Sequence, residues 1–108
     1  LLQHRVLAEN ANQGAATAKL AKLRGAINAF YSDTGLYPLT LTDLTVTSAP
    51  ANGYNAAGTS TSLSASLWNG PYLQSIDTEP VYKTSYTYSR KTDRTPNYYT
   101  VDPTIYAP

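Results

Sequence analysis

The stretch ATAKLAKLRGAINAFYSDTGLYP, residues 16–38, decides the fold of this chain. Its apolar residues recur at alternating steps of four and three, which places them on a single stripe of an α-helix. Gly35 is the expected end of this helix, since Pro38 bars its continuation. The stripe predicts a helix with one buried face, and the residues expected to pack against a sheet are Leu20, Leu23, Ile27 and Phe30.

The helix is predicted to extend N-terminally well beyond this stripe, because no proline precedes Pro38. A helix from about Gln3 to about Ser32 would be on the order of 45 Å long at 1.5 Å per residue. A domain this small cannot bury such a length. We therefore expect residues 1–14 to project from a globular domain of residues 15–108, or to pack against another subunit. The apolar residues expected to make these subunit contacts are Leu2, Val6, Leu7 and Ala11.

The middle of the chain carries little periodic signal. Residues 39–44 favour a helical turn over a strand, with Thr40 or Thr42 as the N-cap. Residues 45–66 are rich in Ser and Thr, so we expect a long surface loop. Residues 68–73 then return the chain to the body of the domain through a turn at residues 69–71.

In the last third of the chain, Tyr or Thr recurs at every second position of one segment. From residue 81 to residue 89 the even positions carry Tyr or Thr, which is the period of a β-strand. Residues 90–96 are expected to form a charged turn and residues 97–101 a second strand. Residues 102–108 would follow as an edge strand or coil, because Pro103 lacks a ladder donor. A long helix followed by a small antiparallel sheet is an α+β fold.

Ten tyrosines are the unusual feature of the composition. Aromatic side chains are the usual filler of a small sheet, so packing is favoured over an electron-hopping role. The tyrosines expected in the core or at its edge are Tyr31, Tyr37 and Tyr72. Those expected to face the helix stripe from the hairpin are Tyr82, Tyr86 and Tyr88, and those expected to be exposed are Tyr98, Tyr99 and Tyr106.

Composition excludes several classes of function. The 108 residues, 42% hydrophobic, suffice for one domain, and only 14% are charged, against roughly 25% in an average soluble domain. The net charge of +1 gives no strong attraction to nucleic acid or anionic lipid. The absence of Cys excludes disulfides and thiolate chemistry, and the absence of Met indicates a processed or excised product. The chain contains no run of 18 apolar residues, so the sequence predicts no transmembrane helix.

No catalytic constellation is present, and an enzyme is not expected. His4 is the only histidine and lies in the first turn of the helix, where a solvated side chain is expected. A catalytic triad or a histidine metal site therefore cannot be built. The seven carboxylates are scattered, and the closest pair, Asp77 and Glu79, is typical of a solvated turn.

Two segments resemble the type IV pilins and the major pseudopilins of type II secretion. The first is Phe30–Pro38. The residues in it that match the family pattern are Tyr31, Asp33, Gly35, Tyr37 and Pro38. The second is Trp68–Leu73, with Trp68, Gly70, Pro71 and Tyr72. The resemblance implies a long N-terminal helix packed on a small antiparallel sheet, with a variable loop between them. It also implies a structural subunit of a pilus or pseudopilus filament, located in the cell envelope or in an extracellular filament and anchored in the inner membrane before assembly.

This sequence departs from the family pattern in two ways. The hydrophobic half of the helix is missing, so membrane contact would need a segment absent here. That segment was either cut off or is supplied by a separate short hydrophobic-helix chain. The resemblance also implies a calcium site near the C-terminus, but only Asp93 and Asp102 are available for it. Two acids do not supply the six to eight oxygens that calcium prefers, so no metal or other cofactor is predicted.

The leading hypothesis is a structural filament subunit that assembles with other pilin subunits through its N-terminal helix. The alternative is a minor pilin that acts as an adhesin or DNA receptor through residues 45–66 and the cluster Arg90, Lys91 and Arg94. Because Asp93 lies in the same turn and no aromatic residues are interleaved, nucleic acid is not the favoured partner. The sequence leaves open whether the filament is a pilus or a secretion pseudopilus.

Overall fold

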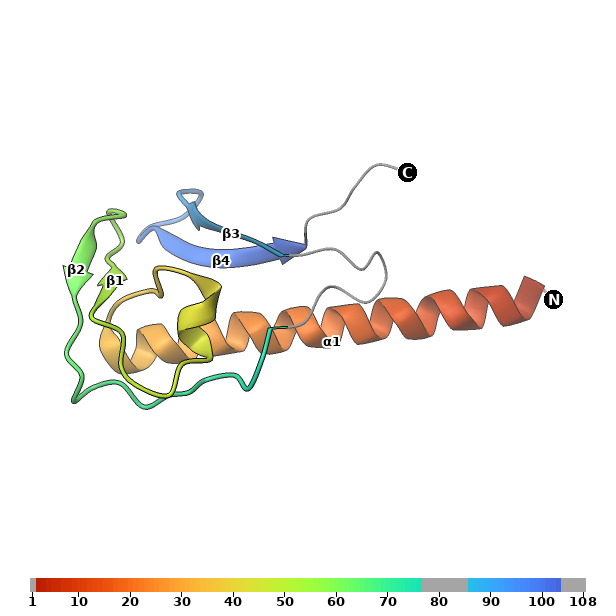
Figure 1. Cartoon of the computed structure of the whole chain (residues 1–108). Helices are drawn as coiled ribbons and strands as arrows, with labels where there is room; N and C mark the ends of the chain where they lie inside the picture. The colour runs from red at the N-terminus through yellow and green to blue at the C-terminus, as the bar shows by residue number, and fades with distance from the viewer. Residues whose placement is uncertain (1, 77–85, 104–108) are drawn as a thin grey trace.

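The computed structural model describes residues 2–76 and 86–103, and it describes side chains for residues 17–76 and 86–102. These residues form a long helix, a turn of 3-10 helix and four short strands (Figure 1). In chain order they are α1 (Leu2–Thr34), η1 (Leu41–Leu44), β1 (Asn52–Tyr54), β2 (Ser60–Ser62), β3 (Tyr86–Lys91) and β4 (Tyr98–Pro103). The strands pair as two antiparallel hairpins, β1–β2 and β3–β4. The predicted α+β class, with a long N-terminal helix packed on a small antiparallel sheet, is confirmed.

The helix α1 ends where the sequence predicts. Gly35 adopts a φ of 74°, and its N–H donates to the carbonyl of Tyr31 at 2.7 Å. This left-handed conformation favours glycine and closes the helix. The hydroxyl of Thr34 turns back to donate to the carbonyl of Phe30 at 2.8 Å. Among the described residues, no helix combines the length and the apolarity needed to cross a bilayer.

The N-terminal half of α1 extends beyond the described strands (Figure 1). The 33 residues of α1 span about 50 Å at 1.5 Å per residue. This length accounts for most of the 55 Å long axis of the molecule. The strands β3 and β4 run alongside the C-terminal half of α1, and β1 and β2 stand at its C-terminal end.

The core lies between the C-terminal half of α1 and the elements that follow it. Leu23, Ile27 and Phe30 are 3%, 1% and 0% exposed, and Leu20 packs partly buried beside them. Fully burying a side chain of this size stabilises the fold by about 1.5–3 kcal/mol. The buried residues that meet this stripe are Leu36, Tyr37, Leu44, Leu63, Leu73, Tyr99 and Val101.

The segment after α1 contains one element that was predicted and one that was not. The helical turn η1 confirms the prediction for residues 39–44, with Thr40 at the N-cap position but without a side-chain capping hydrogen bond. Within residues 45–66, β1 and β2 form a hairpin that the sequence did not predict. Tyr54 of β1 exchanges two backbone hydrogen bonds with Tyr37, at 2.7 and 2.8 Å. This contact between distant residues leaves no periodic pattern in the segment itself.

The hairpin β3–β4 differs from its predicted boundaries. Arg90 and Lys91, predicted in the turn, are the last residues of β3 and pair with Tyr99 and Tyr98. The predicted strand residue Tyr82, with the rest of residues 77–85, lies outside the described residues, as does Tyr106. Residues 102 and 103, predicted as an edge strand or coil, belong to β4.

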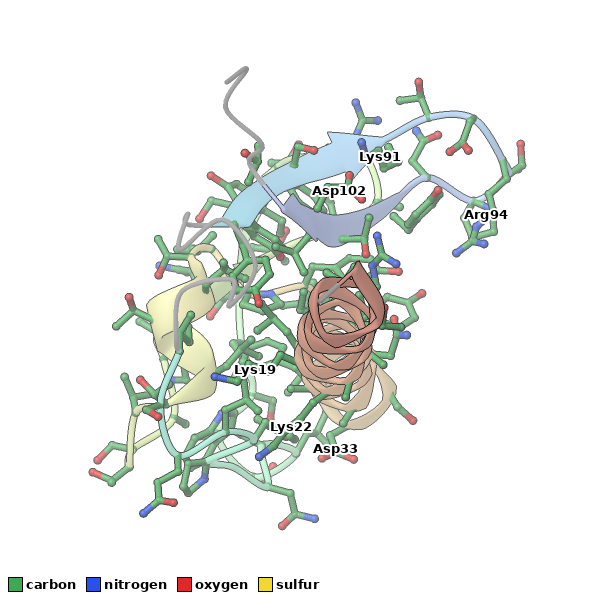
Figure 2. All side chains as sticks on the ribbon, turned by 90° about the vertical axis from the view of Figure 1, so that its right-hand side faces the viewer. Lys19, Lys22, Asp33, Lys91, Arg94 and Asp102 are labelled. Carbon is green, nitrogen blue, oxygen red and sulfur yellow. The ribbon has the colours of Figure 1, made fainter. Side chains whose placement is uncertain are left out.

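The strand nearest to α1 is β4 (Figure 2). Tyr86 and Tyr88 of β3, predicted to face the helix stripe, are partly buried and pack against the core that contains this stripe. Tyr99 was predicted to be exposed, but this prediction is wrong because Tyr99 is only 8% exposed and belongs to the core. Its ring stacks on Tyr54 with centroids 4.9 Å apart and also contacts Tyr37 and Tyr88. Tyr99 and Val101 share one face of β4, since side chains alternate along a strand.

Candidate functional site

The two motif segments of the sequence meet at the C-terminal end of α1. The hydroxyl of Tyr72 donates to Asp33 Oδ2 at 2.7 Å and accepts the N–H of Asn69 at 2.9 Å. The Tyr72 ring also packs on Phe30, with centroids 5.5 Å apart. Residues 39 positions apart are therefore joined by one side chain, and Tyr72 lies at the edge of the core.

The return turn is built by close packing around Trp68. The Trp68 ring meets Tyr72 edge-on at 6.2 Å. Gly70 lies so close to this ring that a Cβ there would come within 2.5 Å of Trp68 Cζ2, which explains the need for glycine. Pro71 follows Gly70 and is exposed.

The other residues of the first motif lie in the core or at its edge. Tyr37 is buried, and Tyr31, which is 37% exposed, stacks on it with centroids 4.4 Å apart. Pro38 is fully buried, and its carbonyl accepts the Tyr88 hydroxyl at 2.6 Å. Burial raises the pKa of Tyr88 far above its ordinary value, so the hydroxyl stays a donor. These contacts are packing contacts that fix the loop after α1.

The cluster Arg90, Lys91 and Arg94 is not a single basic surface. Neighbouring residues of a strand point to opposite faces, so Arg90 and Lys91 diverge. Arg90 donates to the carbonyl of Ala56 at 2.9 Å, beside the β1–β2 hairpin. Lys91 pairs with Asp102 at 3.1 Å on the other face. Arg94 lies 3.8 Å from the centroid of the Tyr98 ring. The predicted DNA contact surface is thus divided, and sequence spacing alone could not reveal the division.

Asp102 connects the helix to the hairpin. Its carboxylate pairs with Lys91 at 3.1 Å and with Arg24 of α1 at 2.6 Å. Arg24 also donates to the carbonyl of Val101 at 3.0 Å. The hydrogen bond from Lys91, together with Arg24, holds the pKa of Asp102 below its ordinary value. Sequence reasoning did not select Arg24, because the partner of a helix-flank arginine depends on tertiary structure.

A shallow hollow of about 410 Å³ lies between α1 and the β3–β4 hairpin. Its charged lining residues are Arg24, Lys91, Asp93, Arg94 and Asp102. Figure 2 shows Lys91, Asp102 and Arg94 on this side of α1, whereas Lys19 and Lys22 lie on the other.

The weak calcium candidates Asp93 and Asp102 both line this hollow, but three cations surround them. Asp93 accepts the Tyr98 hydroxyl at 2.8 Å, and Asp102 carries two ion pairs. Within residues 17–76 and 86–102, no three His, Cys, Asp or Glu side chains are grouped to hold a metal. Both carboxylates are therefore engaged by groups of this chain.

The residues predicted for subunit packing lie on the N-terminal half of α1. The backbone of Leu2, Val6, Leu7 and Ala11 is helical, but their side chains lie outside the described residues, as does that of His4. The structure therefore places these positions on the extending part of the helix without describing their contacts.

A long helix that extends beyond its small antiparallel strands and packs its C-terminal half against them defines a pilin-like structural protein. Residues 5–101 match the family model of type II secretion system protein G, and the chain belongs to this family. No curated protein and no solved structure matches the chain. The family consists of structural pseudopilins and is not known for enzymes. Membership implies contact with other pseudopilin subunits and a location in the cell envelope.

Proposed function

We propose that this chain is a subunit of a type II secretion pseudopilus that assembles with other copies through the N-terminal half of α1. The observation that carries the proposal is the extension of α1 beyond the described strands (Figure 1). A helix half with no described strand beside it offers a surface to a neighbouring subunit.

Repeated contacts of this kind produce a filament. A contact between two different surfaces of identical subunits generates an open helical assembly when the rotation does not close. The apolar residues of the helix half, Leu2, Val6, Leu7 and Ala11, would supply the burial that holds successive copies together. A separate short hydrophobic-helix chain would contact the same half, if the filament contains one.

The alternative function as a DNA receptor has less support. Arg90 and Lys91 are engaged by Ala56 and Asp102, and Arg94 shares its hollow with two carboxylates. Polyanion binding needs several phosphate contacts from free cations. The contacts of Arg90, Lys91 and Arg94 therefore favour the structural role over DNA binding at this cluster.

The experiment uses the native secreting cell and compares charge inserted on the apolar face of the helix half with charge inserted on the opposite face. We expect the double variant Val6→Asp, Leu7→Asp to lose filaments recovered by shearing, because it places charge in a contact that must exclude water. Asn12→Asp adds a charge to the same helix half but on the face opposite Val6 and Leu7 by helical spacing, so this variant should retain filaments. Mass spectrometry of the recovered filaments identifies any additional subunit.

Thermal melting of the purified variants separates assembly from folding. The proposal requires that the melting temperature of Val6→Asp, Leu7→Asp stay close to that of the parent. If filaments persist with both residues changed, the helix half is not the assembly surface.

A further inference from the structure

The chain contains two Asn-Gly dipeptides, Asn52–Gly53 in β1 and Asn69–Gly70 in the turn that follows Trp68. Such a dipeptide can lose ammonia, because glycine has no side chain to keep its backbone nitrogen away from the asparagine side chain. The reaction needs a glycine N–H that is not hydrogen-bonded and an asparagine side chain that can turn towards it. The structure meets both requirements at one of the two dipeptides.

At Asn52–Gly53, the backbone nitrogen of the glycine is held in the β1–β2 ladder. Gly53 lies opposite Thr61. Hydrogen bonds of 2.9 and 3.0 Å join the position pairs 51–63 and 55–59, two residues to either side. Because hydrogen-bonded pairs recur at every second position of an antiparallel ladder, Gly53 and Thr61 form such a pair as well. Gly53 is also buried, so attack by its nitrogen requires the hairpin to open.

At Asn69–Gly70, both reacting groups are available. The Asn69 side chain is exposed, and Gly70 lies outside the helices and strands. Within residues 17–76 and 86–102, neither the Asn69 side chain nor the Gly70 N–H has a hydrogen-bond partner. The backbone N–H of Asn69 donates to the Tyr72 hydroxyl at 2.9 Å, which fixes the turn without occupying the reacting groups.

We propose that Asn69 is a site of spontaneous deamidation in the folded protein, whereas Asn52 is protected. The Gly70 backbone nitrogen bonds to the side-chain carbonyl carbon of Asn69, and the side-chain NH2 group leaves as ammonia with the proton of that nitrogen. One water then opens the cyclic imide at either C–N bond, which leaves aspartate or isoaspartate at position 69. A Cβ on Gly70 would lie 2.5 Å from Trp68 Cζ2, so packing retains the glycine on which the reaction depends.

Deamidation weakens the link between the two motif segments. The Asn69 N–H and the Asp33 carboxylate bind the same Tyr72 hydroxyl, so a carboxylate at position 69 adds a negative charge near Asp33. Isoaspartate also lengthens the backbone of the turn by one methylene, beside the Trp68 ring that meets Tyr72 edge-on. The deamidated protein is therefore expected to be less stable than the parent.

Incubation of the folded full chain at mildly alkaline pH tests the site. Peptide mass spectrometry follows the mass gain from replacement of NH2 by OH. Cleavage after aromatic residues separates the two asparagines, because Tyr54 and Trp68 lie between them. Asn69 should be deamidated at least about tenfold faster than Asn52, since reaction at Asn52 requires local opening. Equal rates, or a faster rate at Asn52, would overturn the assignment.

Two controls assign the difference to the fold. In concentrated urea both dipeptides are unfolded, so their rates should become similar. A difference that persists in urea would come from the local sequence and would contradict the proposal. In folded Asn69→Gln, where cyclisation needs a larger ring, the mass gain at position 69 should be nearly lost while that at Asn52 is unchanged. A gain that persists at position 69 of this variant would rule out the imide route.

The stability of the product tests the consequence. Ion exchange isolates the deamidated protein, because it carries an additional negative charge. Its melting temperature should lie below that of the parent by roughly 4 °C or more. An unchanged melting temperature would contradict the weakened link between Asp33 and Tyr72, and the site itself would then stand on the mass measurements. These measurements do not involve filaments, so their outcome is independent of the function proposed above.

Discussion

Asp102 takes part in two ion pairs, with Arg24 and with Lys91, and it joins α1 to the β3–β4 hairpin. The side chains of Arg24 and Asp102 are 41% and 44% exposed, so water screens their attraction. We expect Asp102→Asn to lower the free energy of unfolding by about 1 kcal/mol at neutral pH, the upper range for exposed ion pairs. Urea unfolding measures this difference.

The pH dependence identifies the ionised carboxylate as the cause. Because the folded state lowers the pKa of Asp102 below 3.8, its contribution is present above that value and is lost as the pH falls through the folded-state pKa. The parent and Asp102→Asn should therefore converge in strongly acidic solution. Asp43→Asn is the control, since the Asp43 carboxylate has no ion pair or hydrogen bond within residues 17–76 and 86–102. An equal loss at every pH would instead assign the effect of Asp102→Asn to packing.

Some individual residues could be predicted from the sequence and others could not. Leu23, Ile27 and Phe30 share a helical stripe, and the structure buries all three. Tyr99 was misplaced, although its even spacing from Val101 on a strand already indicated a common face. Arg24 left no such signal, because its partner Asp102 lies 78 residues away.

Among the elements, length decides what a sequence can predict. The helix α1 covers 33 residues, so the same apolar spacing recurs over several turns, and Gly35 marks the end of the helix. The strands β1 and β2 have three residues each and depend on backbone hydrogen bonds between Tyr54 and Tyr37. Their existence is a property of the folded chain, and the local sequence does not carry it.

Two glycines in different elements predict opposite effects of one substitution. Gly25 lies within α1, and a Cβ there would meet no atom within 4 Å. Gly25→Ala should raise the free energy of unfolding by roughly 0.8–1 kcal/mol through helix propensity. In β1, a Cβ on Gly53 would lie 2.8 Å from Leu36 Cβ and from the carbonyl oxygen of Tyr37. Gly53→Ala should lower the free energy of unfolding by roughly 1–3 kcal/mol through overpacking.

Denaturant titration of the two alanine variants beside the parent checks this pair. The substitution is chemically the same at both sites, so a change of sign can come only from the surroundings. Destabilisation at Gly25 would mean that α1 is more crowded than the structure shows. Stability at Gly53 would mean that β1 shifts freely away from residues 36 and 37.

At the scale of the whole molecule, the arrangement of core and helix was predictable because α1 is too long for its sheet. The resemblance of two short motifs anticipated the family, and the structure explains why both are present: Asp33 and Tyr72 hold the two segments together. The surface could not be predicted in the same way. The separation of Arg90 from Lys91 depends on strand register.

The division of α1 into two halves predicts that the N-terminal half is dispensable for folding. Removing residues 1–14 leaves a helix of 20 residues, about 30 Å long, that still carries every described core residue of α1. Helical stability in proteins comes chiefly from tertiary packing, so this remainder should stay helical against β4. We expect the truncated chain to melt cooperatively within a few degrees of the parent, as followed by circular dichroism, while losing its place in filaments. A chain that no longer melts cooperatively would show that the N-terminal half belongs to the folding unit and would contradict the boundary after residue 14. Retention in filaments with normal melting would instead locate assembly on the globular surface.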